Sequence, residues 1–163
     1  PEEAAALVTE ALAIYTELAD FERQARVMET LMHARYMAKD NEDGLRLAGE
    51  IVNAYRLAGN GAREAMAQQD YAEAFFKANR ADDAQEAAEH ALVLFREIGN
   101  QTGERNMRAL LMEVDTLREN LLAKQQYYDQ VLQESKGCLQ AYYQGDNQYL
   151  YNVANALYKA KKG

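Results

Sequence analysis

The stretch LFREIGNQTGERNM, residues 94–107, is the third copy of a pattern that recurs along the chain. The earlier copies are YTELADFERQARVM at residues 15–28 and YRLAGNGAREAM at residues 55–66. When the polar turns are aligned, Asp20, Asn60 and Asn100 become equivalent, with 40 residues between successive copies. A fixed period of this size indicates supersecondary units that stack on one another.

The apolar residues around the turn follow the same offset. Four rows are equivalent: Tyr15, Tyr55 and Phe95; Leu12, Val52 and Leu92; Ala11, Ile51 and Ala91; Val8, Ala48 and Ala88. A second turn falls halfway through the period, in KDNEDG at 39–44 and NRADDA at 79–84. Each period therefore predicts two helices, the first over 21–39, 61–79 and 101–120, and the second over 43–58 and 82–98.

The composition favours an all-α domain. The chain has 163 residues, 48% of them apolar, which is enough for one domain with a core. Good helix formers dominate, and short runs rich in Val, Ile and Thr are absent. The single proline is Pro1, so no helix breaker lies in the interior of the chain.

The turn at residues 98–103 could be a phosphate-binding loop, a glycosylation site or a link between helices. It lacks the lysine and Ser/Thr of a nucleotide-binding P-loop, and no strand precedes it. Asn100-Gln101-Thr102 is a glycosylation acceptor only in a secreted chain. We therefore expect helix caps: Gly59 and Gly99 end helices with positive φ, Asn100 or Thr102 caps the next helix, and Asp82 or Asp83 caps the helix over 82–98.

The stretch AEAFFKANRADDAQEAAEHALVLF, residues 72–95, resembles the tetratricopeptide (TPR) family in its alternation of small and bulky residues. The usual aromatic near the start of the first helix is replaced by Gln68, and the closing proline by REIGN. The period of 40 exceeds the usual 34. It is similar to the subclass found in kinesin light chains, spindle-orientation adaptors and some bacterial regulators. The resemblance implies antiparallel helix pairs stacked into a right-handed α-solenoid.

This resemblance divides the single domain, residues 1–163, into five parts. Residues 1–19 correspond to the second helix of a repeat whose first helix is missing. Full repeats follow at 21–58 and 61–98, then a degenerate repeat at 101–136 and a tyrosine-rich helical cap at 138–163. The helix over 2–19 cannot bury both faces alone. We therefore expect the chain to be a piece of a longer array, or another protein to cover that edge, and an apolar patch to mark the helix.

The repeat pattern weakens after residue 120. LLAKQQYYDQVLQES predicts a helix with Leu121, Leu122, Tyr128, Val131 and Leu132 facing inward, SKGC and QGDN read as turns, and QYLYNVANALYKAKKG reads as a final helix. Seven of the eleven tyrosines lie in this region, among them Tyr149 and Tyr151. They either cap the solenoid or form a partner interface, since tyrosine combines a large contact area with a polar tip.

Charge and cysteine content narrow the possible partners. The net charge is −8, with −10 on the first 120 residues and +2 on the rest. An acidic body repels nucleic acid and anionic membranes, and no apolar run is long enough to span a bilayer. Cys138 is the only cysteine, which excludes an internal disulfide and favours a reducing, intracellular compartment, most simply the cytoplasm.

The sequence offers no catalytic or metal-binding constellation, so we expect neither an enzyme nor a cofactor. His33 and His90 fall in different repeats, without another histidine or a cysteine at ligand spacing. No nucleophile is paired with a base. The methionines recur at helix-facing positions and are interpreted as core residues.

The function that the resemblance implies is a non-catalytic scaffold that binds a peptide or helix of another protein on its concave face. The family pattern places these residues inward: Arg26, Glu29, His33 and Tyr36; Met66, Gln69, Glu73, Phe76 and Lys77; Asn106, Ala109, Glu113 and Thr116. One alternative is a structural subunit of a larger complex, held by its edges and its tyrosine-rich end. Another is a regulatory module of a longer enzyme or transcription regulator.

Overall fold

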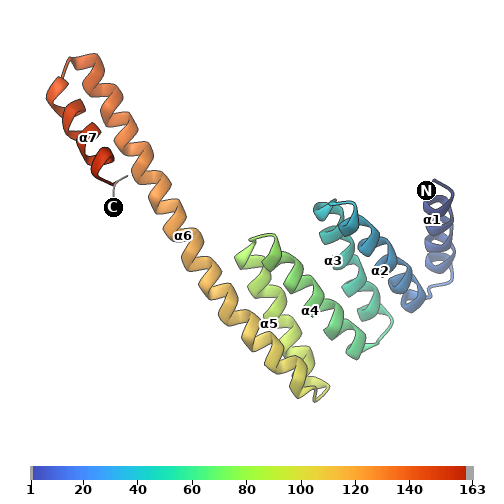
Figure 1. Ribbon diagram of the computed structural model, residues 1–163. Helices are drawn as coiled ribbons and strands as arrows, with labels where there is room; N and C mark the ends of the chain where they lie inside the picture. The colour runs from blue at the N-terminus through green and yellow to red at the C-terminus, as the bar shows by residue number, and fades with distance from the viewer. Residues whose placement is uncertain (1, 161–163) are drawn as a thin grey trace. The chain divides into compact units, whose positions relative to one another are not determined.

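The computed structural model describes the backbone of residues 2–160 and the side chains of residues 7–156 and 158. This part of the chain is all-helical, without strands. The helices are α1 (Glu2–Glu17), α2 (Phe21–Met37), α3 (Asn41–Leu57), α4 (Gly61–Lys77), α5 (Ala81–Glu97), α6 (Gln101–Gln144) and α7 (Asn147–Ala160) (Figure 1). The first five agree with the expected helices to within two residues at each end.

The regularity of the fold comes from its turns. Helices α2 to α5 have 17 residues each and begin every 20 residues, as does α6. Each turn contains one residue of positive φ, in order Ala19, Lys39, Gly59, Asn79 and Gly99. The next amide donates back into the helix that has just ended, as Asn100 N does to Phe95 O at 2.8 Å. This is the Schellman arrangement, and it reverses the chain within three residues.

Side-chain caps then start most of the following helices. Asp20, Asp40, Asn60 and Asn100 each accept a hydrogen bond from the amide three residues later. The expected caps at Gly59, Gly99 and Asn100 are therefore confirmed. The expected cap of α5 by Asp82 or Asp83 is wrong, because Arg80 occupies the N-cap position without a side-chain cap bond. Asp83 instead accepts a hydrogen bond from Arg80 Nε at 2.7 Å.

The chain forms two compact units, Pro1–Arg118 and Glu119–Gly163, and α6 contributes to both. In the first unit, each of α1 to α5 packs against its neighbour in the chain (Figure 1). The repeated small and aromatic positions are buried, with exposed fractions of 1% at Tyr55 and 2% at Phe95. Ala48 and Ala88 are buried between helices in the same way. The 40-residue offset is thus visible in the packing.

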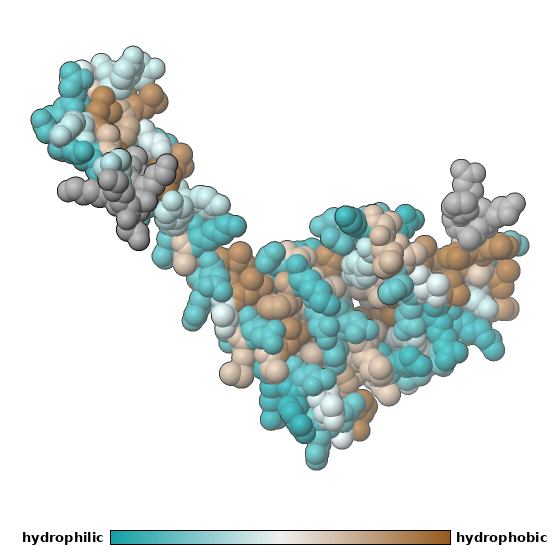
Figure 2. Space-filling model, in the orientation of Figure 1, coloured by the Kyte–Doolittle hydropathy of each residue, from teal (hydrophilic) through white to brown (hydrophobic). Residues whose placement is uncertain are grey.

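Helix α1 exposes apolar side chains, as expected for a helix with one uncovered face. Leu7, Ile14 and Leu18 are 66%, 47% and 68% exposed, whereas Leu12 packs against the core. Figure 2 shows hydrophobic residues gathered at this end of the first unit. What covers this face remains a prediction.

The second unit contains the end of α6 and α7, and it corrects two expectations. SKGC is not a turn: α6 continues through it to Gln144, and the Ser135 hydroxyl bonds back to Val131 O at 2.7 Å. Gly137 makes room for α7, because a Cβ there would lie 2.5 Å from Tyr149 Oη. The turn at QGDN is confirmed, with φ of 72° at Gly145 and Asp146 capping α7.

The second correction concerns side chains expected to face inward on α6. Leu122, Tyr128, Val131 and Leu132 are 40–56% exposed, and only Leu121 is half-buried. Helix α7 has 14 residues, about 21 Å at 1.5 Å per residue, so it covers little beyond the last turns of α6. The preceding stretch of α6 therefore keeps an exposed apolar surface.

Candidate functional site

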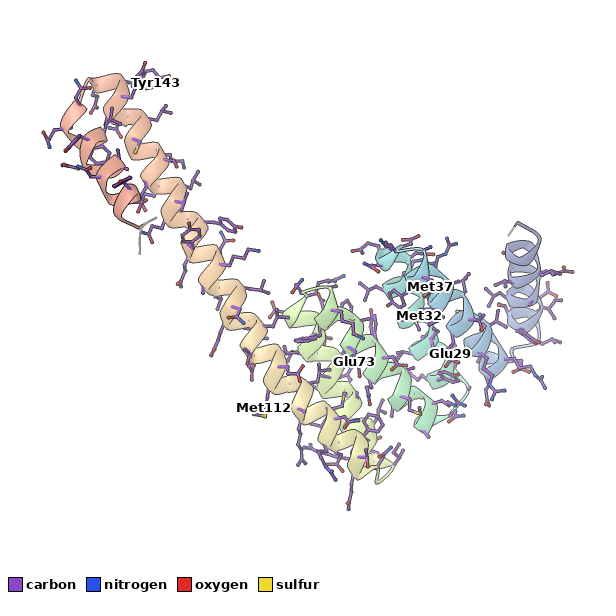
Figure 3. The ribbon with its side chains drawn as sticks, in the orientation of Figure 1. Glu29, Met32, Met37, Glu73, Met112 and Tyr143 are labelled. Atoms are coloured by element: carbon purple, nitrogen blue, oxygen red, sulfur yellow. The ribbon has the colours of Figure 1, made fainter. Side chains whose placement is uncertain are left out.

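A groove of about 490 Å³ lies between α2 and α4 in the first unit. Its lining residues are Met32, His33 and Tyr36 of α2, Asn41 and Leu45 of α3, and Asp70, Glu73, Ala74, Lys77 and Ala78 of α4 and its cap. A small extension of about 20 Å³ adds Glu29 beside Met32 and Asp70. We call the two together the α2–α4 groove. Figure 3 shows Glu29 and Met32 on α2 and Glu73 on α4 in the space between these helices.

The apolar part of the groove is built on a close approach between α2 and α3. A Cβ at Gly44 would lie 2.5 Å from Cε1 of Tyr36, so glycine lets the Tyr36 ring lie directly on α3. Leu45, 5% exposed, and Met32, which packs against the core, complete this surface. The ring and the two aliphatic side chains suit an apolar group of a ligand.

The hydroxyl of Tyr36 is a buried polar atom without a hydrogen-bond partner among the described residues. Burial raises the pKa of this hydroxyl above its ordinary value, and the nearby Asp70 and Tyr71 raise it further. Buried polar atoms are usually paired, so an unpaired one on the wall of a groove is a place where a ligand atom can bond.

Three carboxylates contribute the polar part of the groove. Glu29 Oε1 accepts a hydrogen bond from Tyr55 Oη at 2.8 Å. Glu73 accepts one from Gln69 at 3.0 Å and lies 3.6 Å from Lys77 Nζ. Asp70 makes no hydrogen bond or ion pair with any residue that the structure describes. Two of the three carboxylates are therefore already engaged, and the third is free to meet a ligand.

The surroundings of Asp70 disfavour its charge. Partial burial in the groove raises its pKa above the ordinary value, the charges of Glu73 and Glu29 raise it further, and Lys77 opposes them. Although flanked by two helices, the side chain still reaches solvent through the mouth of the groove. It therefore keeps an accessible negative charge that a bound cation would stabilise.

The structure brings together five of the expected binding residues and separates the rest. His33, Tyr36, Glu73 and Lys77 line the main groove and Glu29 its extension, while Gln69 contacts it through Glu73. Arg26, Met66 and Phe76 lie on the same helices but are not among the lining residues, and neither are Asn106, Ala109, Glu113 and Thr116 of α6. Tyr149 and Tyr151 belong to the second unit, where they are 39% and 63% exposed.

Sequence reasoning missed Met32 and Asp70. Met66, Asp70, Glu73 and Lys77 recur at spacings of four, three and four, which is one face of a helix, so the period contained the signal for Asp70. Met32 was interpreted as a core residue, and it both packs against the core and lines the groove.

Two further cavities complete the description. One of about 300 Å³ lies between α3, α4 and α5, and His90 lines it together with Gln68, Tyr71 and Glu86. The other, about 490 Å³, lies in the second unit between Tyr127, Cys138 and Tyr142 of α6 and Val153 of α7. His33 and His90 thus line different cavities, and no cluster suited to a metal ion occurs among the described residues.

Comparison with known proteins places no name on this arrangement. No protein-family model matches the chain, and no curated protein matches it significantly. Within residues 2–160, no helix combines the length and the apolar character that crossing a membrane requires.

Proposed function

We propose that this protein is a non-catalytic TPR-like scaffold that binds a peptide or helix of another protein in the α2–α4 groove. The observation that carries the proposal is the groove itself, a concavity of about 490 Å³ with an aromatic and aliphatic floor and a few polar side chains at its sides. Ligand sites in proteins have this composition.

The helix arrangement supports the TPR-like assignment. Helices of 17 residues alternate in pairs, α2 with α3 and α4 with α5, and each pair repeats the turns of the one before. In the right-handed solenoid that the resemblance implies, α2 and α4 are the first helices of successive pairs and form the concave wall. The groove has this pair of helices as its sides.

The side chains in the groove favour binding over catalysis. They supply carboxylates, an amide, a lysine and apolar surface, but no nucleophile paired with a base. The single cysteine, Cys138, fits a reducing, intracellular compartment and belongs to the second unit.

The test uses peptides selected for binding to the whole chain from a displayed random library. The double variant Tyr36→Ala/Phe76→Ala removes the ring on the groove floor and its repeat equivalent, and should weaken the selected peptides about tenfold or more. Tyr151→Ala, an exposed tyrosine of the second unit, is the matched control and should bind as the parent does. Unchanged binding by a double variant with native circular dichroism would refute the groove as the site.

A structural subunit of a larger complex is the second candidate, because both ends of the described chain expose apolar side chains. Leu7, Ile14 and Leu18 do so on α1, and seven tyrosines between residues 127 and 158 are 39–79% exposed. If this role is correct, Leu7→Glu with Leu18→Glu should abolish co-purification with the complex while peptide binding in the groove persists.

A further inference from the structure

The charge of the α2–α4 groove differs from that of the rest of the first unit. On the outer surfaces, carboxylates are matched by arginines: Arg35 with Asp43, Arg46 with Glu50, Arg56 with Glu64, Arg80 with Asp83, and Arg118 with Asp82. In the groove, Glu29, Asp70 and Glu73 face one cationic lining residue, Lys77. The unmatched negative charge of this unit therefore gathers where a ligand would bind.

The one lysine does not neutralise the site. Lys77 Nζ lies 3.6 Å from Glu73, and its side chain is 75% exposed, so it is directed to the rim of the groove. Asp70 forms no ion pair with the described residues. A cation from outside would meet an accessible carboxylate with a second carboxylate one helical turn away.

The buried hydroxyl of Tyr36 is a second and independent indication of the ligand. Its oxygen is shielded from solvent and has no partner among the described residues, although Tyr36 lines the groove. An N–H donor carried by the ligand would supply the missing hydrogen bond. Such a donor, combined with positive charge, describes a guanidinium group, which offers five N–H donors in a planar fork.

We propose that the α2–α4 groove recognises a peptide segment that carries an arginine beside an apolar residue. The guanidinium binds Asp70 and Glu73 and donates to Tyr36 Oη, while the apolar side chain packs on Met32, Tyr36 and Leu45. This inference rests on the proposed function and specifies its ligand. Nucleic acid and phosphorylated or acidic peptides are disfavoured at the same place, since their charge has the sign of the groove.

The raised pKa of Asp70 accords with this assignment. Burial and the charges of Glu73 and Glu29 disfavour the carboxylate in the empty groove, with Lys77 as the opposing cation. A guanidinium relieves this repulsion, so binding should lower the pKa of Asp70 and release no net charge conflict at neutral pH. Binding of the arginine peptide should weaken as Asp70 takes up its proton on acidification.

The experiment begins with random peptides about ten residues long, which span about 33 Å when extended. They are displayed, selected on the full chain and remade with a fluorescent label. Arginine next to Leu, Met or Phe should be enriched in the selected set. Replacing that arginine by citrulline, which keeps its shape and removes its charge, should raise Kd about tenfold or more. Added salt should also weaken binding.

Asp70→Asn and Glu73→Gln should each reproduce the effect of citrulline, and Tyr36→Phe should weaken binding less, because it removes one neutral acceptor. Glu97→Gln, an acid of α5 that is not among the lining residues, is the matched control and should bind as the parent does. All four changes are nearly isosteric, and native circular dichroism confirms that the variants fold.

The outcomes separate this inference from the proposed function. Peptides that lose affinity with Tyr36→Ala/Phe76→Ala but lack basic residues, or that tolerate Asp70→Asn and citrulline, would overturn the arginine assignment and leave the groove as a binding site. Peptides indifferent to Tyr36→Ala/Phe76→Ala would refute the groove itself. Self-association of the chain that Asp70→Asn abolishes would make a second copy the occupant and would also overturn the inference.

Discussion

Gly103→Ala tests the packing between α5 and α6 with a single added methyl group. A Cβ at residue 103 would lie 2.5 Å from both Cε1 and Cγ of Phe95, and closer still to Cδ1. Phe95 is 2% exposed, so its ring has little room to move aside. The close approach of the helix start to the ring therefore depends on glycine.

Two opposing terms set the size of the effect. Alanine in place of glycine stabilises a helix by up to about 1 kcal/mol. Forcing extra atoms into a packed core costs about 1–3 kcal/mol. Because the ring carbons would be well inside van der Waals contact, overpacking wins, and we expect a net loss of about 0.5–2 kcal/mol. For a chain of this length, that corresponds to a fall in Tm of about 2–6 °C.

Gly61→Ala is the matched control, because Gly61 also lies in the first turn of a helix but has space around it. A Cβ there would meet only Ile98 Cγ2, at an ordinary 3.9 Å. This variant should be as stable as the parent or slightly more stable. Urea denaturation followed by circular dichroism measures both changes. A Gly103→Ala protein as stable as Gly61→Ala would refute the packing of Phe95 described above.

Three further predictions concern the core and the groove. Ala88→Leu and Ala91→Leu, both at fully buried positions, should each cost about 1–3 kcal/mol, and unchanged thermal unfolding would contradict the repeat alignment. Tyr55→Phe should cost about 1–2 kcal/mol, because Glu29 loses its buried donor. The pKa of Tyr55 is raised to about 12, so its share of the stability should be present below about pH 10 and be lost between about pH 10 and 12, unlike in Tyr55→Phe. Asp70→Asn should raise Tm at neutral pH, since the raised pKa of Asp70 means that its charge opposes folding, and the gain should shrink as acid protonates the parent carboxyl; a lower Tm at pH 7 would contradict this sign.

Helix boundaries were predictable from the sequence because their causes are local or repeated. Gly59 and Gly99 mark two helix ends directly, as both adopt φ of 70°. Ala19, Lys39 and Asn79 adopt the same left-handed conformation without being glycine, so these turns were found only through the period. The repeat supplied what the local sequence did not.

The second unit was less predictable because a distant contact decides its structure. SKGC has the composition of a turn, yet Gly137 lies inside α6 because the Tyr149 side chain of α7 approaches it. Without knowledge of that approach, a glycine beside a lysine and a serine is read as a chain reversal. A small residue in a helix can thus signal a contact as well as an end.

The chemistry of the groove was harder to predict than its walls, because the positions that fix the fold and those that line the groove vary differently between repeats. The buried rows keep their character, as in Tyr55 and Phe95 or Ala48 and Ala88. The groove rows do not: Glu29, Gln69 and Ala109; Thr30, Asp70 and Leu110; His33, Glu73 and Glu113; Tyr36, Phe76 and Thr116. The 40-residue offset carries a position from one repeat to the next but carries no side chain with it. The acidic groove therefore belongs to one junction, where Glu29 of one pair meets Asp70 and Glu73 of the next, and recognition by this protein should be specific to that junction.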